Sequence, residues 1–218
     1  MCKIVIIGGK GTAVNIAECI VDANEKYGAK DEFIGYCIDD LSLGDAINGY
    51  PILCNLSALG ANFNDIDDVR YLFALYKPAE MRKRVELLSV LGLPMSKFTN
   101  FIHPSCTVLK SSNMGVGNAF LPGCMLSNNS RIGNFNILNT HCIIEHDTVL
   151  GNNNFLADQT IIGSHVRVAD GNFFGMHSAV LEDTNIGCYN FIGMGGVLLR
   201  SIGDNKIMVG LPAKELNK

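Results

Sequence analysis

An apolar side chain recurs every six residues through the second half of the chain. From Ile102 this six-residue step reaches Leu198 through seventeen apolar positions without a break. The positions are Ile102, Val108, Met114, Phe120, Leu126, Ile132, Leu138, Ile144, Leu150, Leu156, Ile162, Val168, Phe174, Val180, Ile186, Ile192 and Leu198. Such a repeat predicts a solenoid, because each short repeat can bury its apolar side chain only against neighbouring repeats.

A second, longer period of three six-residue repeats, or hexads, predicts the cross-section of this solenoid. Gly115, Gly133 and Gly151 are three hexads apart, and Gly187 follows after six more hexads. Three hexads, each with one short strand and one turn, then close one triangular coil. We expect the glycines to mark a corner whose backbone geometry favours glycine. Three cysteines, Cys106, Cys124 and Cys142, are also three hexads apart, and we expect them to be small core residues stacked on successive coils.

The first hundred residues have a different pattern. Apolar runs at 3–8, 33–38, 51–54 and 70–75 alternate with helix-like stretches, the longest at 12–27 and 78–92. This alternation is typical of βαβ units and a parallel sheet. We therefore predict a Rossmann-like α/β domain over residues 1–100, followed by a parallel β-helix domain over residues 101–218.

Composition excludes several classes of partner. Charged residues make up only 17% of the chain and the net charge is -4, so no basic surface is expected for nucleic acid or an anionic membrane. No apolar run approaches the roughly 20 residues of a membrane span, and no signal peptide is recognisable. The eight cysteines include no CxxC pair, which favours reduced thiols. We predict a cytoplasmic protein that binds neither nucleic acid nor membrane.

Together these features resemble one family. The hexad lattice, the closing segment Val-Gly-Leu-Pro-Ala-Lys at 209–214, the junction Ile-His-Pro-Ser at 102–105, and Asn139 followed by Glu145-His146-Asp147 are similar to the sialic-acid O-acetyltransferase-like sugar acyltransferases. The resemblance implies a left-handed helix, a homotrimer, and acetyl-CoA as acyl donor in the grooves between subunits, with no metal. It implies as acceptor a UDP- or dTDP-linked 4-amino-4,6-dideoxy sugar.

The resemblance also implies catalytic residues. His146 matches the general base of the family, and Asp147 is the acidic neighbour that raises its basicity. Imidazole suits this task because its ordinary pKa lies near neutrality and an ammonium group must lose a proton before it attacks a thioester. Asn139 matches a family asparagine found near the base, where an amide can orient the imidazole.

Four further positions are expected to bind the donor. Phe155 stands where well-known members carry a second histidine near the thioester, so we expect a more apolar donor pocket. This departure leaves the identity of the acyl group open. By alignment, Ser164, Met176 and Met194 fall at positions whose backbone contacts the donor.

The N-terminal half carries two expected acceptor-binding segments. Lys10, Gly11 and Thr12 follow the first strand and open a helix, whose free N–H groups suit a pyrophosphate. Asp39 and Asp40 end the second strand, and family members use an acidic pair there to hold the uracil or ribose of a nucleotide sugar. An acidic residue at a strand end binds sugar hydroxyls in many α/β folds.

Three alternatives remain open at this point. O-acetylation of a sugar needs a base at the same place as N-acetylation. A non-catalytic protein that binds a nucleotide sugar could also retain the fold. His141 and His146 have the spacing of two zinc ligands of γ-type carbonic anhydrases, which share this β-helix.

Overall fold

A computed structural model describes residues 2–216 of the protein. The first part of the chain is an α/β fold. Its elements in chain order are β1 (Lys3–Ile7), α1 (Thr12–Tyr27), β2 (Glu32–Cys37), β3 (Ala46–Ile47), β4 (Tyr50–Cys54), α2 (Leu59–Phe63), β5 (Val69–Phe73) and α3 (Met81–Val90). The four predicted strands and both predicted helices are therefore present, although the second predicted helix begins at Met81, after a 3₁₀ turn over Pro78–Glu80. The short elements β3 and α2 were not predicted.

The sheet of this part places a switch point beside β1. Its strand order is β3-β4-β2-β1-β5, and β1 pairs in parallel with both β2 and β5. The chain therefore winds outward from β1 through β2 to β4 and then returns to the other side of β1. In open parallel sheets, ligands bind at the carboxyl ends of the strands beside such a switch.

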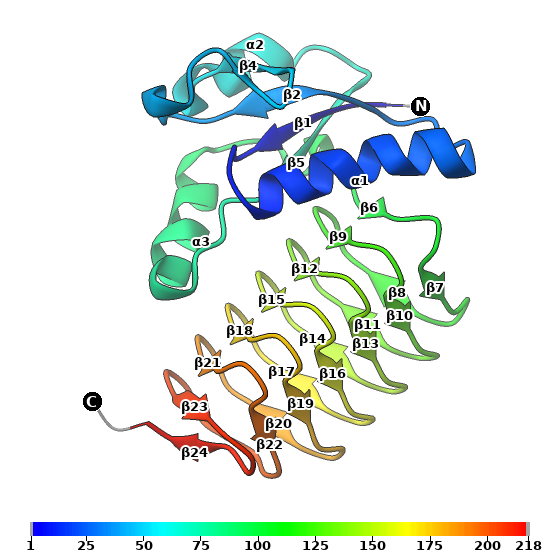
Figure 1. The fold of residues 1–218 in the computed structure, drawn as a ribbon, viewed down its shortest axis with the longest axis vertical. Coiled ribbons are helices and arrows are strands. Elements are labelled where there is room, and N and C mark those ends of the chain that lie inside the picture. Colours follow the sequence, from blue (N-terminus) through cyan, green and yellow to red (C-terminus); the bar gives the residue numbers. More distant parts are fainter. Residues whose placement is uncertain (1, 217–218) are drawn as a thin grey trace.

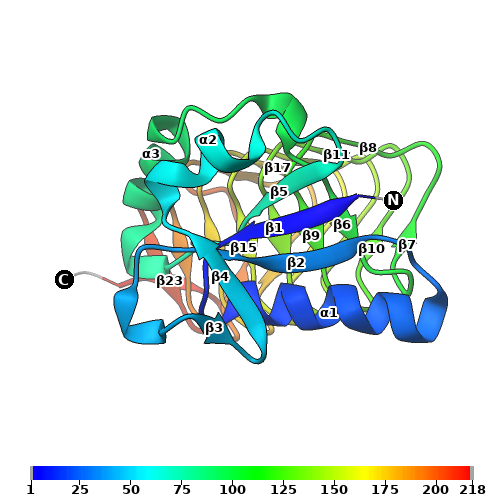
Figure 2. The same ribbon diagram turned by 90° about the horizontal axis from the view of Figure 1, so that it is seen from above.

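Helix α1 lies between this sheet and the second half of the chain (Figure 1). Its apolar face buries Ile16 and Ile20 in a cluster with Ile4 of β1 and with Phe101 and Ile137 of the solenoid. Figure 2 shows the sheet from above, with α1 running alongside its strands. The α/β part is thus fixed on the solenoid through a continuous apolar core.

The second half folds into the predicted triangular β-helix. Its strands, two residues each except β23, are β6 (Phe101–Ile102), β7 (Thr107–Val108), β8 (Asn113–Met114), β9 (Ala119–Phe120), β10 (Met125–Leu126), β11 (Arg131–Ile132), β12 (Ile137–Leu138), β13 (Ile143–Ile144), β14 (Val149–Leu150), β15 (Phe155–Leu156), β16 (Ile161–Ile162), β17 (Arg167–Val168), β18 (Phe173–Phe174), β19 (Ala179–Val180), β20 (Asn185–Ile186), β21 (Phe191–Ile192), β22 (Val197–Leu198), β23 (Ile207–Val209) and β24 (Lys214–Glu215). Every third strand from β6 to β22 pairs in parallel, which produces three sheets.

The three sheets are named here by the strand in the third coil. The β12 sheet faces α1, and the β13 and β14 sheets form the other two sides of the prism. One corner joins the β12 and β13 sheets, and a second joins the β13 and β14 sheets. The α/β part and this left-handed parallel β-helix together confirm the predicted fold class.

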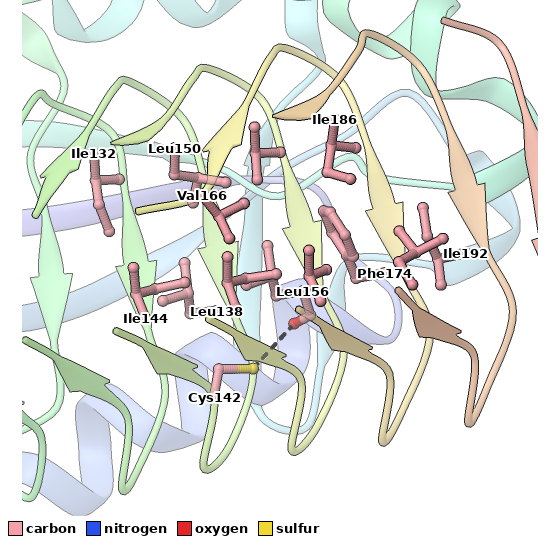
Figure 3. Packing of buried hydrophobic residues seen from close by; sticks show 14 of the residues in the cluster. Ile132, Leu138, Cys142, Ile144, Leu150, Leu156, Val166, Phe174, Ile186 and Ile192 are labelled. Carbon is pink, nitrogen blue, oxygen red and sulfur yellow. Dashed lines mark hydrogen bonds between the residues drawn. The ribbon is translucent and has the colours of Figure 1, made fainter. Parts of the chain in front are cut away.

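The hexad positions form the core of the β-helix (Figure 3). Fourteen of the seventeen predicted side chains are buried. The exceptions are Ile102, Val108 and Met114, which belong to the first coil and have no preceding coil to cover them. Burial of one such side chain contributes roughly 1.5–3 kcal/mol, so the stack is the main source of stability for the solenoid.

The glycines of the longer period are present for a reason other than the predicted one. None of Gly115, Gly133, Gly151 and Gly187 has a positive φ. A side chain at Gly133 would instead place its Cβ 2.6 Å from Oδ1 of Asn152 on the next coil, and a Cβ at Gly115 would meet Asn134 in the same way. These glycines are required by the close approach of successive coils.

Two of the three stacked cysteines are buried core residues as predicted, and Cys106, on the first coil, is half-buried against the same core. Cys124 and Cys142 are buried, and their thiols donate to the carbonyl oxygens of Asn139 at 2.9 Å and Ala157 at 3.1 Å.

Within residues 2–216, no helix has the length and apolar character that a membrane crossing requires.

Candidate active site

His146 and Asp147 lie together at the corner between the β13 and β14 sheets. They form the turn that joins β13 to β14, and both side chains reach solvent, with 44% and 37% of their surface exposed. Nδ1 of His146 lies 2.8 Å from Oδ2 of Asp147. The predicted pairing of an imidazole with the following carboxylate is therefore present in the fold.

The carboxylate of Asp147 is held from two sides. The hydrogen bond from His146 lowers the pKa of Asp147, and a second one from Nδ2 of Asn129 at 3.1 Å acts in the same direction. Asn129 occupies the same corner one coil earlier. Since both partners favour the charged form, Asp147 is ionised at neutral pH.

This geometry fixes the tautomer of the neutral imidazole. A carboxylate accepts hydrogen bonds, so Nδ1 of His146 carries the proton that it donates to Asp147. The lone pair of Nε2 then remains free to accept a proton from a substrate. Asp147 also stabilises the imidazolium that would form.

Two residues of the next coil lie beside this pair. Ser164, a predicted donor contact, occupies the position of His146 at the same corner, one coil later. The ring of His165 packs edge-on against the ring of His146, with a centroid separation of 5.3 Å. Sequence reasoning had not brought His165 to the base, although its offset of three hexads from Asp147 was a signal for this contact.

Asn139 does not lie beside His146 within one chain. It is buried at the corner between the β12 and β13 sheets, and its amide nitrogen donates to the carbonyl oxygen of Leu156 at 3.0 Å. Met176 and Met194 share this corner and are exposed. The predicted site residues of the β-helix are therefore divided between the two edges of the β13 sheet, and their common role stays a prediction.

Phe155 has a packing environment that was not expected. Its ring is only 8% exposed and lies between the solenoid and the α/β part, 5.2 Å from the ring of Phe173 and 6.0 Å from that of Tyr76. Phe155 thus belongs to the core between the two parts of the chain. Its contact with the acyl donor stays a prediction.

All five predicted acceptor-binding residues line one cleft at the carboxyl ends of β1, β2 and β5. This cleft encloses about 690 Å³. Its lining comprises Lys10, Gly11, Thr12, Ile38, Asp39, Asp40, Leu56, Ala74, Leu75, Tyr76, Lys77, Arg84 and Leu87. Helix α1 begins at its edge, and Gly11 adopts a positive φ of 51° at the N-cap without a side-chain cap. The N–H of Ala13 donates to the carbonyl oxygen of Lys10 at 3.2 Å, but the positive end of the α1 dipole still lies at the cleft, where it favours an anionic ligand.

The two aspartates of the cleft have different surroundings. Nζ of Lys10 contacts Oδ2 of Asp40 at 2.5 Å, and this contact, with further hydrogen bonds from Ser42, lowers the pKa of Asp40 to about 2. Oδ1 of Asp39 instead accepts the backbone N–H of Leu56 at 2.8 Å. Asp40 thus presents a permanent negative charge, whereas Asp39 ties the end of β2 to the segment after β4.

Sequence reasoning missed the far wall of the cleft. Tyr76 and Lys77 follow β5, and Arg84 lies on α3. The carboxyl end of β5 was a usable signal for the first two, because parallel strands end at one edge of the sheet. Arg84 reaches the cleft only through the packing of α3.

Comparisons with known proteins agree with this architecture. No protein-family model and no curated protein matches the chain. Among solved structures, PerB from Caulobacter crescentus, in complex with CoA and GDP-perosamine, is 28% identical; the match covers 100% of this chain and 98% of PerB, with a TM-score of 0.83. A histidine-to-alanine variant of the GDP-perosamine N-acetyltransferase from the same organism gives 26% identity and a TM-score of 0.84, and covers 100% of this chain and 98% of its own.

A more distant structure shares the fold. The acetyltransferase domain of PglB from Neisseria gonorrhoeae FA1090, in complex with acetyl coenzyme A, is 22% identical, with 98% of each chain covered and a TM-score of 0.81. The chain therefore shares its fold, an α/β part before a left-handed β-helix, with solved hexapeptide-repeat sugar acetyltransferases, the family that its sequence resembles.

Proposed function

We propose that the protein transfers an acetyl group from acetyl-CoA to the amino group of a nucleotide-linked amino sugar, with His146 as general base. The observation that carries this proposal is the His146–Asp147 pair, exposed at a β-helix corner. It occurs in a chain that matches, over its whole length, a protein solved with CoA and GDP-perosamine.

The reaction needs only one proton acceptor. The sugar nitrogen attacks the thioester carbonyl as a neutral amine, after its ammonium form has released one proton, and Nε2 of His146 takes the second proton that the nitrogen loses as it becomes an amide. The C–S bond then breaks, an amide forms, and the proton passes from His146 to the departing sulfur to give CoA. We propose direct transfer, without an acyl-enzyme; the thiols of Cys124 and Cys142 are buried inside the solenoid, away from any substrate.

The cleft of the α/β part is the proposed site for the nucleotide. The diphosphate fits the open N-terminus of α1 and Lys10, and the carboxylate of Asp40 can accept hydrogen bonds from the base or ribose. Residues 1–100 then form the nucleotide-sugar-binding domain, and residues 101–218 the acyltransferase domain.

A homotrimer accounts for the divided donor site. The corner with His146 and Ser164 and the corner with Asn139, Met176 and Met194 flank the β13 sheet. That sheet and its edges expose apolar side chains, among them Ile161, Leu181 and Leu199. We propose that a second copy covers this face, so that the corners of adjacent chains meet and enclose acetyl-CoA.

Eight free thiols in the described chain suit the reducing cytoplasm.

A screen of acceptors tests the function. The purified protein would be incubated with acetyl-CoA and GDP-, UDP- or dTDP-linked 4-amino sugars, with the matching 4-hydroxy sugars as controls. Acetylated amine is the expected product. Acetylation of the hydroxy sugars alone would identify an O-acetyltransferase, and binding without turnover would identify a non-catalytic protein.

A further inference from the structure

His165 extends the His146–Asp147 pair into a group of three metal-ligating side chains. It occupies the turn between β16 and β17, and its backbone N–H donates to the carbonyl oxygen of His146 at 3.1 Å. Asp147 and His165 hold the same left-handed corner position on successive coils, with φ of 59° and 57°. The coil repeat therefore places the His165 side chain directly beside the pair.

The three side chains are close to the spacing that a metal ion needs. One ligand atom each of His146, Asp147 and His165 lies within 4.8 Å of the others. Zinc binds imidazole nitrogen at about 2.0–2.1 Å in tetrahedral geometry, which requires ligand atoms about 3.4 Å apart. His165 is exposed, and within the described residues no side-chain hydrogen bond holds it. Rotation of this one side chain can therefore close the gap.

We propose that His146, Asp147 and His165 bind a Zn²⁺ ion that inhibits the enzyme. Because Asp147 lies on the Nδ1 side of His146, the ion binds Nδ1, and the one proton of the neutral ring then lies on Nε2. Nε2 can no longer accept a proton from the substrate, so bound zinc and proton transfer exclude each other. The inhibitory effect rests on the proposed function of His146 as general base. The binding of zinc to the three side chains does not depend on that function.

The ligand chemistry selects the class of ion. Two imidazoles and one carboxylate suit zinc and its borderline neighbours, and the exposed corner leaves a position for water. Mg²⁺ and Ca²⁺ prefer oxygen ligands and are expected to bind weakly, because this group offers only one carboxylate. The ion acts here as an inhibitor, and the transfer reaction does not require it.

Direct binding tests the site without any assay of activity. Zn²⁺ would be titrated into the protein by calorimetry without substrates, and Co²⁺ would report the ligand set by its visible spectrum. We expect one ion per chain, without the intense sulfur-to-cobalt band that cysteine ligands would give. His165→Asn should weaken zinc binding by at least about tenfold, since loss of even an outer partner costs 10–100-fold.

A matched variant controls for the substitution. His177→Asn changes another exposed histidine with a φ of 56°, but at the corner between the β12 and β13 sheets. Asparagine tolerates this left-handed backbone, so neither variant should unfold the chain. Zinc affinity should be unchanged in His177→Asn. Equal affinity in His165→Asn and wild type, or a sulfur-to-cobalt band, would overturn the proposed site.

Inhibition is measured separately, by chromatography of the acetylated sugar, because the CoA thiol itself binds zinc. Wild-type turnover should fall at the zinc concentrations that saturate the site and return with a chelator, while His165→Asn should remain active under the same zinc. Zinc binding without turnover on any acceptor would contradict the proposed function and leave the site standing. Turnover without zinc binding would contradict the proposed zinc site and leave the proposed function standing.

Discussion

Nδ1 of His146 donates to the carboxylate of Asp147 across 2.8 Å, so the chain orients its proposed base through the next residue in sequence. Replacement of the carboxylate should therefore misorient the imidazole without removing it. We expect Asp147→Asn to lower kcat, by less than loss of the base itself. Asp183→Asn is the matched control, because Asp183 is exposed and holds the same corner position two coils later, with the same φ of 59°. Equal activity in the two variants would contradict the orienting role.

The pH dependence of the rate follows from the same pair. The pKa of Asp147 is lowered in the folded protein, so its charged carboxylate stabilises the fold at any pH above the ordinary carboxyl pKa of about 3.9. This contribution to the stability of the fold is lost only as the pH falls through the lowered pKa of Asp147. Asp147 therefore stays charged throughout an assay between pH 5 and 9. We expect kcat to rise with pH, because a protonated imidazole cannot accept the proton that the sugar amine loses. A pH-independent rate would mean that no imidazole acts as base.

The acceptor cleft gives a prediction about binding. Asp40→Ala should raise the KM for the nucleotide sugar and leave the affinity for acetyl-CoA unchanged, because Asp40 lines the cleft of the α/β part, whereas the residues proposed to bind the donor belong to the β-helix. Since Lys10 and Ser42 hold the pKa of Asp40 at about 2, this contribution should not vary between pH 5 and 9. Asp45→Ala changes an exposed aspartate outside the cleft and should have no effect. Equal losses of both affinities in Asp40→Ala would indicate a disturbed fold.

The exposed β13 sheet gives a prediction about assembly. Light scattering should yield three times the chain mass of 23.6 kDa. Ile161→Glu places a charge on this face and should dissociate the trimer and abolish activity. Ile66→Glu alters an isoleucine in the α/β part that is equally exposed, at 42%, and should leave the assembly intact. A wild-type monomer at micromolar concentration would contradict the shared donor site.

The close approach of the coils gives a prediction about stability. Gly133→Ala should lower the free energy of unfolding by about 1–3 kcal/mol, because the added Cβ would lie 2.6 Å from Asn152 and the neighbouring coil must move. Gly203→Ala is the control, since a Cβ there meets no atom within 4 Å. Denaturant titration of both variants measures the difference. A Gly133→Ala variant as stable as Gly203→Ala would disprove the packing explanation.

The sequence predicted the β-helix well because its core repeats at a fixed interval along the chain. The explanation predicted for the glycines, a special backbone conformation, was wrong, since the atoms that exclude a side chain at Gly133 belong to another coil. The separation of Asn139 from His146 was visible in principle. One hexad carries the chain from one corner of the prism to the next, and these two residues lie in consecutive hexads. The resemblance, rather than the lattice, had placed them together.

The acceptor cleft was predicted only where it follows from strand order. Lys10 and Asp40 end neighbouring parallel strands, and such ends meet at one edge of a sheet. Arg84 enters the cleft from α3, whose position depends on its contacts with the β-helix, including the ring of Tyr189 beneath Arg82 at 3.9 Å. No local pattern in the sequence reports such contacts.

The most direct test of the account is the activity of His146→Ala on the best acceptor found. A positioned general base contributes about 10²–10⁴ in rate, so kcat should fall by that factor while the affinity for acetyl-CoA stays nearly constant. The rise of the rate with pH should vanish in the variant. Near-full activity of His146→Ala, with its pH dependence preserved, would contradict the proposed mechanism.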